Sequence, residues 1–266
     1  MTALLGCGRL GEALLSGLLR AGHAPESIVV VDSPARVEEL VAVHGVTGAT
    51  AAQAVIAAEL LIVAVKPGDV PGLLAELAPA VDPGRHLLVS VAAGVPTATL
   101  EALLPQGTPV VRVMPNTPAL VGEGMSAVAA GASATAAHLD AVEAVLRTVG
   151  RVLRIPEGQL DAVTAVSGSG PAYVLFLVEA MTDAGVLLGL PRAIALELVT
   201  QTVLGTGLLL RETGEHPAQL REAVTSPGGT TAAALRELER HGVRAAFLDA
   251  LEAARDRSRA LAAAAG

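Results

Sequence analysis

Aromatic side chains are nearly missing from this sequence of 266 residues, and it contains a single cysteine. Phenylalanine, tyrosine and tryptophan together make up 1% of the chain, so it has almost no side chains on which nucleic-acid bases could stack. The one thiol, Cys7, excludes an intramolecular disulfide and a metal site built from several cysteines. Cys7 lies inside a glycine-rich loop, which favours a structural interpretation, a small residue that fits there, over a catalytic one.

Positive charge is also scarce. Lysine and arginine number 18 against 26 aspartates and glutamates, which gives a net charge of −8. Binding to a phosphate backbone requires a basic surface, so nucleic acid is not an expected partner. The 6 histidines are scattered, and we expect neither a bound metal nor a histidine–carboxylate catalytic pair.

Long uninterrupted apolar segments are also missing, although hydrophobic residues make up 52% of the chain and charged residues only 17%. This composition predicts a folded protein. The most apolar segment, residues 172–190, contains Glu179 and Asp183, which favours a buried helix of a soluble protein over a membrane span. The chain enters a strand pattern at once, without a basic leader, so we expect a cytoplasmic protein with no membrane partner.

What the sequence does contain, in its first half, is an alternation of short apolar runs with helical patterns. Such an alternation predicts an α/β fold: a Rossmann-type, doubly wound parallel sheet with helices on both faces. The expected strands are Leu4–Leu5, Ile28–Val31, Leu60–Val65, Leu87–Val91 and Val110–Val113, with edge strands at 126–129 and 152–155 around a helix at 135–149.

After Pro156 the strand patterns stop and only helical patterns follow. We expect helices at about 160–188, 192–212, 217–224, 230–241 and 244–264. The boundary therefore falls near residue 155, between a dinucleotide-binding domain (1–155) and an all-α domain (156–266). Several of these helices are apolar around much of their circumference, which favours a subunit interface over a self-contained bundle.

The segment from Gly6 to Gly11 matches the pattern G-x-G-x-x-G, directly after a strand and at the start of a helix. In a dinucleotide-binding fold Gly6 makes the tight turn, Gly8 lets the pyrophosphate approach the backbone, and Gly11 lets the helix pack on the strand. The phosphates then lie at a helix N-terminus, where free N–H groups point at them. Asp32 ends the next strand, where an acid binds the ribose 2′-hydroxyl.

The same region gives conflicting indications about the cofactor. The Asp32 carboxylate repels a 2′-phosphate and so favours NADH. Ser33 and Arg36 follow closely, and both are able to bind a 2′-phosphate, which favours NADPH. The sequence leaves both cofactors open.

Three further segments are candidates for function. Lys66, the only lysine, follows the third strand at the sheet edge where ligands bind, which favours a cofactor-loop role. Met114–Pro118 ends a later strand at the same edge. Ser226–Thr231 precedes a helix, and its two interpretations are equally supported: an N-cap with proline in the first turn, or a carboxylate site at the helix N-terminus.

Taken in order, these motifs resemble those of the pyrroline-5-carboxylate reductase family. The matching segments are Gly6–Gly11, Ala64–Pro67, Ser90–Val95, Arg112–Ala119, Ser167–Tyr173, Gly214–Pro217 and Ser226–Thr231. Each is weak alone, but the ordered set is specific and covers nearly the whole chain.

The resemblance implies reduction of 1-pyrroline-5-carboxylate to L-proline, the last step of proline biosynthesis, with NADPH or NADH. It implies that Ser226, Gly228, Gly229, Thr230 and Thr231 bind the substrate, with the Thr231 hydroxyl as the candidate catalytic group near the ring nitrogen. It also implies a homodimer through the all-α domain, with dimers assembling further into decamers. The expected cofactor contacts are Gly6, Gly8, Arg9, Leu10, Gly11, Asp32, Ser33, Arg36, Ala64, Val65, Lys66, Pro67, Ala92, Ala93 and Asn116.

One departure concerns the turn after the second strand. The family often carries an Asn-Arg-Ser-like turn there, whereas this chain has Asp32-Ser33-Pro34. The departure calls the family's usual preference for NADPH into question.

Two rival classes remain as alternatives. A β-hydroxyacid dehydrogenase has a similar layout but needs a lysine in its second domain, and this chain has none beyond residue 66. A non-catalytic dinucleotide sensor would bind the cofactor without turnover, and the carboxylate loop argues against it. The preference among cyclic imino acids and the oligomer size stay open.

Overall fold

The computed structural model of the protein describes residues 1–265. The chain folds into two compact units: residues Met1–Ser169 together with the C-terminal part from Ala254, and residues Gly170–Ala253. The expected boundary near residue 155 stays a prediction.

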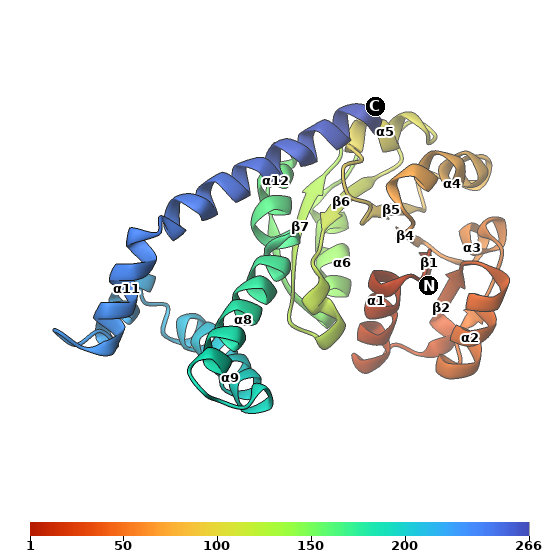
Figure 1. Cartoon of the computed structure of the whole chain (residues 1–266). Coiled ribbons are helices and arrows are strands. Elements are labelled where there is room, and N and C mark those ends of the chain that lie inside the picture. The colour runs from red at the N-terminus through yellow and green to blue at the C-terminus, as the bar shows by residue number, and fades with distance from the viewer. Residues whose placement is uncertain (266) are drawn as a thin grey trace. The chain divides into compact units, whose positions relative to one another are not determined.

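The first unit is built on a sheet of eight strands in the order β3-β2-β1-β4-β5-β6-β7-β8 (Figure 1). All neighbouring strands run parallel except β6 and β7. The strands are β1 (Thr2–Leu5), β2 (Ile28–Val31), β3 (Thr47–Gly48), β4 (Leu60–Val63), β5 (Leu87–Ser90), β6 (Val110–Met114), β7 (Gly124–Ala130) and β8 (Gly150–Arg154). The predicted fold class is confirmed, and all seven predicted strands are present. The two-residue β3 is the addition, because its short exposed edge carries no apolar pattern.

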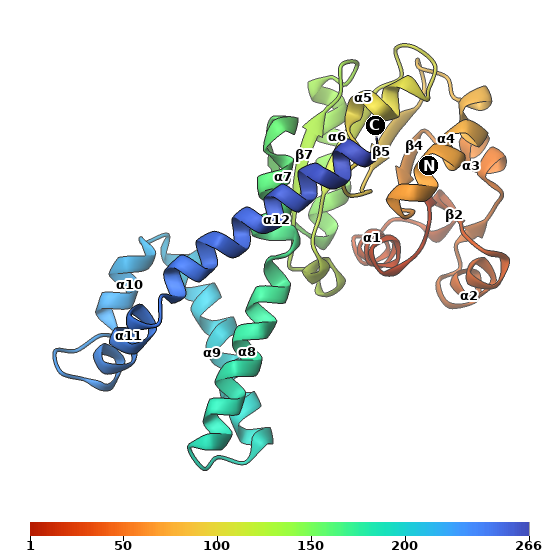
Figure 2. The same ribbon diagram turned by 45° about the horizontal axis from the view of Figure 1, so that its top comes forward.

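Helices cover both faces of this sheet (Figure 2). They are α1 (Arg9–Arg20), α2 (Pro34–His44), α3 (Ala51–Ala57), α4 (Val70–Leu77), α5 (Thr97–Ala102) and α6 (Ala136–Leu146). Alternate strand residues enter different cores: Leu4 packs with residues of α1, α2 and α6, whereas Ala3 and Leu5 pack with α3, α4 and α5. Burial on both sides explains why the strands are continuous apolar runs in the sequence.

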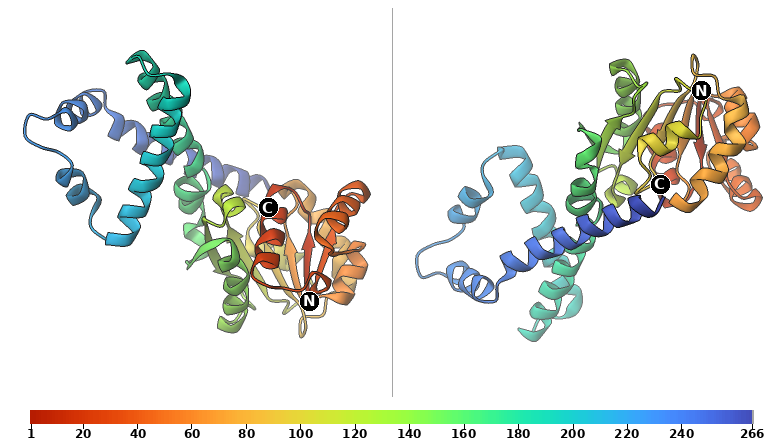
Figure 3. Two further views of the ribbon diagram at one scale, coloured as in Figure 1. Left: turned by 90° about the horizontal axis from the view of Figure 1, so that it is seen from below. Right: turned by 90° about the horizontal axis from the view of Figure 1, so that it is seen from above.

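The chain then becomes entirely helical. After α7 (Leu160–Val163) and a π-helical turn at Thr164–Gly168, the second unit contains α8 (Gly170–Leu187), α9 (Arg192–Thr213), α10 (Pro217–Ala223) and α11 (Thr230–Arg240). The helices α8 and α9 form a hairpin whose turn contains Gly189 at a φ of +97° (Figure 3). The long helix α12 (Val243–Ala265) begins in this unit and ends in the first.

The apolar helix expected at 172–190 is not buried within the single chain. Phe176 is 74% exposed and Leu187 is 87% exposed. The stretches Glu157–Leu187 and Arg192–Thr213 are long and apolar enough to span a membrane, by length and composition only. The physical reason for the exposure is that α8 and α9 cover only one side of each other, so their outer faces require a further partner.

Candidate active site

The glycine loop between β1 and α1 combines two crowded glycines with one open glycine. At Gly6, which has a φ of +93°, an added Cβ would lie 2.8 Å from the carbonyl carbon of Ala64. At Gly11 it would lie 2.3 Å from the Gly6 carbonyl oxygen, whereas at Gly8 it would meet no atom within 4 Å. Gly8 is also the N-cap of α1 and has no side chain to cap the helix. The loop thus leaves space and N–H groups at the helix N-terminus, which fits a dinucleotide pyrophosphate.

This open space belongs to a pocket of about 420 Å³ at the carboxyl ends of β1, β2 and β4. Seven of the predicted cofactor residues are brought together there: Gly6, Gly8, Asp32, Ser33, Ala64, Val65 and Lys66. The remaining lining residues are Leu5, Val31, Asp69 and Leu73.

The Asp32 carboxylate is fixed at the end of β2 by two backbone donors. The Cys7 N–H donates to Oδ2 over 2.7 Å, and the Ser33 N–H donates to Oδ1 over 2.7 Å. Burial raises the pKa of Asp32, but these donors outweigh it and hold the pKa below its ordinary value. Asp32 is therefore ionised at neutral pH.

The Arg36 guanidinium lies on α2 but outside the residues that line this pocket. Its Nε donates to the Cys7 carbonyl over 3.2 Å, and its two terminal nitrogens pair with Glu12 at 2.5 Å and with Glu39 at 2.7 Å. These partners tie α2 to the glycine loop and to α1.

The thiol of Cys7, which is part of the same loop, is buried. Burial raises the pKa of this thiol to about 12, and the Asp32 charge acts in the same direction. The thiol stays protonated, which agrees with its structural interpretation.

A second pocket, of about 160 Å³, brings together three other predicted residues: Arg9, Leu10 and Asn116. The side-chain amide of Asn116 is already hydrogen-bonded within the protein. Its Oδ1 accepts the Met125 N–H at 2.8 Å, and its Nδ2 donates to the carbonyl and hydroxyl oxygens of Ser167, both at 3.2 Å. Asn116 thus holds the loop after β6 to β7 and to the segment before α8.

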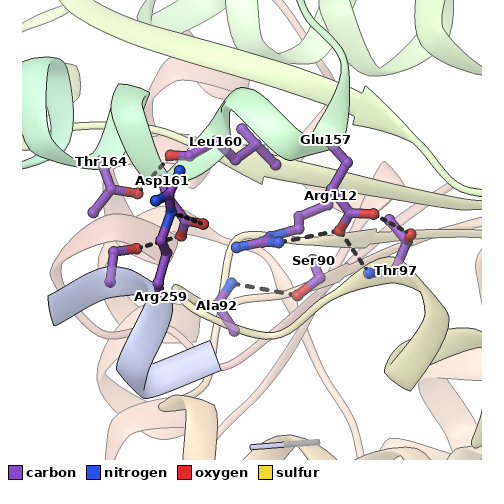
Figure 4. Close-up of polar contacts among 10 residues, drawn as sticks. Ser90, Ala92, Thr97, Arg112, Glu157, Leu160, Asp161, Thr164 and Arg259 are labelled. Carbon is purple, nitrogen blue, oxygen red and sulfur yellow. Dashed lines mark hydrogen bonds and ion pairs between the residues drawn. The ribbon is translucent and has the colours of Figure 1, made fainter. Parts of the chain in front are cut away.

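The loop after β5, which contains the predicted residues Ala92 and Ala93, is held by a polar network (Figure 4). The Ala92 N–H donates to the Ser90 hydroxyl over 3.3 Å. At the other end of the loop, the Thr97 N–H and hydroxyl donate to Glu157 over 2.8 and 2.6 Å. The buried Arg112 side chain pairs with the same carboxylate at 3.1 Å.

Sequence reasoning missed this network, although a signal was present. Arg112 stands inside the apolar run of β6, and a charge buried in a strand requires a partner. Burial raises the pKa of Glu157, but the donors from Thr97 and Arg112 outweigh it and hold the pKa below its ordinary value.

The predicted substrate loop, Ser226–Thr231, lies in the second unit. Gly228 has a φ of +70°, and the Gly229 N–H donates to the Ser226 carbonyl over 3.0 Å. Gly229 is the N-cap of α11 and carries no side-chain cap. The interpretation as an N-cap with proline in the first turn is wrong, since Pro227 precedes the N-cap. Within residues 1–265, the hydroxyls of Ser226, Thr230 and Thr231 form no hydrogen bond.

A mostly parallel sheet with an open glycine loop, an ionised acid at the end of β2 and a helical second unit defines a nicotinamide-dependent oxidoreductase. Two family models match the chain: pyrroline-5-carboxylate reductase dimerisation over residues 157–261, and coenzyme F420-dependent NADP oxidoreductase over residues 2–94. The chain is 48% identical to pyrroline-5-carboxylate reductase of Mycobacterium tuberculosis, with 97% of this chain and 96% of the relative covered. It is 41% identical to the Escherichia coli enzyme, with the same coverage. The chain belongs to the pyrroline-5-carboxylate reductase family.

Solved structures agree with this assignment. A pyrroline-5-carboxylate reductase of Coxiella burnetii superposes with a TM-score of 0.93 at 34% identity, over 98% of this chain and 97% of that one. The Plasmodium falciparum reductase, solved with NADP bound, gives 0.86 at 28% identity over the same shares. The predictions of the family, of the fold class and of a nicotinamide cofactor are confirmed, and the dimerisation match supports oligomer formation through the C-terminal region.

Proposed function

We propose that the protein reduces the C=N bond of 1-pyrroline-5-carboxylate with a hydride from NAD(P)H, giving L-proline. The observation that carries the proposal is the open space at Gly8 beside the fixed Asp32 carboxylate, in a chain of this family. These features belong to a dinucleotide site, and the curated relatives are named for this substrate.

In the proposed cofactor site, the N–H groups at the start of α1 bind the pyrophosphate and Asp32 accepts hydrogen bonds from a ribose. Lys66 lines the same pocket and contributes a positive charge. When bound, the cofactor supplies the hydride. The contacts of Glu157 with Thr97 and Arg112 tether the end of the loop after β5.

In the proposed substrate site, the uncapped N-terminus of α11 and the hydroxyls of Ser226 and Thr230 bind the substrate carboxylate. The Thr231 hydroxyl accepts a hydrogen bond from the protonated ring nitrogen or relays a proton to it. A protonated imine is already an electrophile, so positioning and exclusion of water provide most of the catalysis.

The proposal includes a homodimer through α8 and α9, assembly of dimers up to a decamer, and a cytoplasmic location. The exposed apolar faces of α8 and α9 lie within the residues that match the dimerisation model. This supports the proposal that a second copy of the chain packs against these faces. Light scattering on the purified protein distinguishes a dimer from a decamer by mass.

Turnover of 1-pyrroline-5-carboxylate, followed by the absorbance of NADH or NADPH, tests the proposal. We expect rapid turnover by the wild type and a loss of about 100-fold in kcat for Thr231→Ala, the size of a typical acid–base contribution. Thr231→Ser, which keeps the hydroxyl, is the matched control and should retain most of the activity. Binding of both the cofactor and the substrate without turnover would instead support the alternative, a non-catalytic dinucleotide sensor.

A further inference from the structure

The ribose end of the cofactor pocket is defined by the Asp32 carboxylate. Each of its oxygens already accepts one backbone N–H, from Cys7 and from Ser33, so the group cannot swing away without losing both bonds. An ionised carboxylate is acceptor-only and has about four lone-pair sites, so it still accepts from ribose hydroxyls. A 2′-phosphate brings about two negative charges at neutral pH and offers it no proton.

Arg36, the cation whose charge acts on Asp32, is already bound to other groups of the protein. It donates to the Cys7 carbonyl and pairs with both Glu12 and Glu39. Turning the guanidinium toward a phosphate would break these ion pairs and leave two carboxylates without their partner. One guanidinium therefore stands among three carboxylates, those of Asp32, Glu12 and Glu39.

The turn after β2 also lacks free donors. The Ser33 N–H is bound to Asp32, and Pro34, at the first position of α2, has no N–H. Asp69 lines the same pocket as Lys66, so the lining carries a further negative charge beside its one positive charge. The Ser33 side chain also hydrogen-bonds to the Asp32 carboxylate, so its hydroxyl is not free for a 2′-phosphate.

From these contacts we propose that the enzyme selects NADH over NADPH, with Asp32 as the specificity-determining residue and the Glu12 and Glu39 pairs keeping Arg36 from rescuing the phosphate. This inference deepens the proposed function and rests on it. It resolves the conflict between Asp32 and Arg36 in favour of Asp32.

Binding titrations of NADH and of NADPH, followed by nicotinamide fluorescence or calorimetry without substrate, test this directly. We expect the wild type to bind NADH at least about tenfold more tightly than NADPH, since the phosphate meets like charge. In Asp32→Ser the ratio should move toward NADPH by at least about tenfold, through weaker NADH and tighter NADPH binding.

A second variant tests the role of the glutamates while Asp32 is intact. In the double variant Glu12→Gln/Glu39→Gln, Arg36 becomes available, so NADPH should bind several-fold more tightly and NADH within about twofold of wild type. The matched control is Glu38→Gln on the same helix. Its exposed carboxylate has no partner within residues 1–265, and it should leave the ratio unchanged although it also removes one negative charge from α2.

The outcomes separate the two proposals. Equal or tighter binding of NADPH by the wild type would overturn the NADH preference, as would an unchanged ratio in a folded Asp32→Ser variant. Turnover of 1-pyrroline-5-carboxylate with both cofactors at equal kcat/KM would also overturn it while the proposed function stands. Selective NADH binding without turnover would refute the proposed function and leave the preference intact.

Discussion

The ion pair of Arg112 and Glu157 gives a sharp test of how the loop after β5 is held. The Arg112 side chain is 9% exposed and that of Glu157 is 29% exposed. The change Glu157→Gln keeps the shape of the side chain: one oxygen remains for the Thr97 N–H and for Arg112, and the new amide can donate to the Thr97 hydroxyl. What it removes is the counter-charge of a buried guanidinium.

The expected cost follows from this burial. Removing one partner of a fully buried pair costs roughly 3–5 kcal/mol, so a variant that keeps the hydrogen bonds at a partly exposed carboxylate should lose about 2 kcal/mol of unfolding free energy. The double variant Glu157→Gln/Arg112→Met should lose at least about 1 kcal/mol less unfolding free energy than the sum of the losses in the two single variants, because neither charge is then left alone. The exposed pair of Arg36 and Glu39 is shorter, at 2.7 Å, but Glu39 is 59% exposed. Glu39→Gln should therefore cost less than about 1 kcal/mol.

Urea unfolding at pH 7, at one protein concentration because the chain oligomerises, measures these differences. The folded-state pKa of Glu157 lies below its ordinary value of 4.5. Its stabilising contribution is therefore fully present above about pH 4.5 and is lost as the pH falls through the folded value. The gap between wild type and Glu157→Gln should narrow accordingly. A cost below about 0.5 kcal/mol, additive costs, or a gap that does not change with pH would refute the reasoning.

Three further predictions concern the glycine loop and the helical unit. Gly11→Ala forces a Cβ against the Gly6 carbonyl and should cost about 1–3 kcal/mol in urea unfolding, so a fully stable variant would contradict the packing argument. Gly8→Ala meets no atom within 4 Å and should cost less than about 1 kcal/mol. The same Cβ fills the pyrophosphate space, so NADH should bind at least about tenfold more weakly in a titration. Phe176→Glu places a charge on the exposed apolar face of α8 and should shift the protein to monomer by light scattering, whereas Val43→Glu, on α2, should not.

Much of the fold could be predicted from the sequence because its causes are local. The runs at Ile28–Val31 and Val110–Val113 are apolar throughout since both sheet faces are covered, and each is a strand in the structure. The two-residue β3 carries no such pattern. The helix expected from 160 to 188 is in fact interrupted by the π-helical turn at Thr164–Gly168, which apolar spacing does not reveal.

The candidate site was predictable to a different degree in each part. The glycine loop and Asp32 were found because their spacing is fixed by one βαβ unit, and the pocket brings them together. Thr97, Arg112 and Glu157 were missed because Arg112 and Glu157 are 45 residues apart in the sequence. Asn116 was expected to contact the cofactor, and its amide is bound to Met125 and Ser167. Its contact with the cofactor stays a prediction.

The sequence by itself determined the alternation of strands and helices, the phosphate loop and the family, because hydrophobic periodicity and glycine spacing act over a few neighbouring residues. The tertiary structure alone decided which charges are paired. From its place in the sequence, Arg36 could equally bind a 2′-phosphate or pair with Glu12 and Glu39. Only the folded structure shows that it pairs with these two glutamates, because Glu12 belongs to a different helix. Electrostatic energy depends on distances across elements, and those distances are set by packing rather than by local sequence.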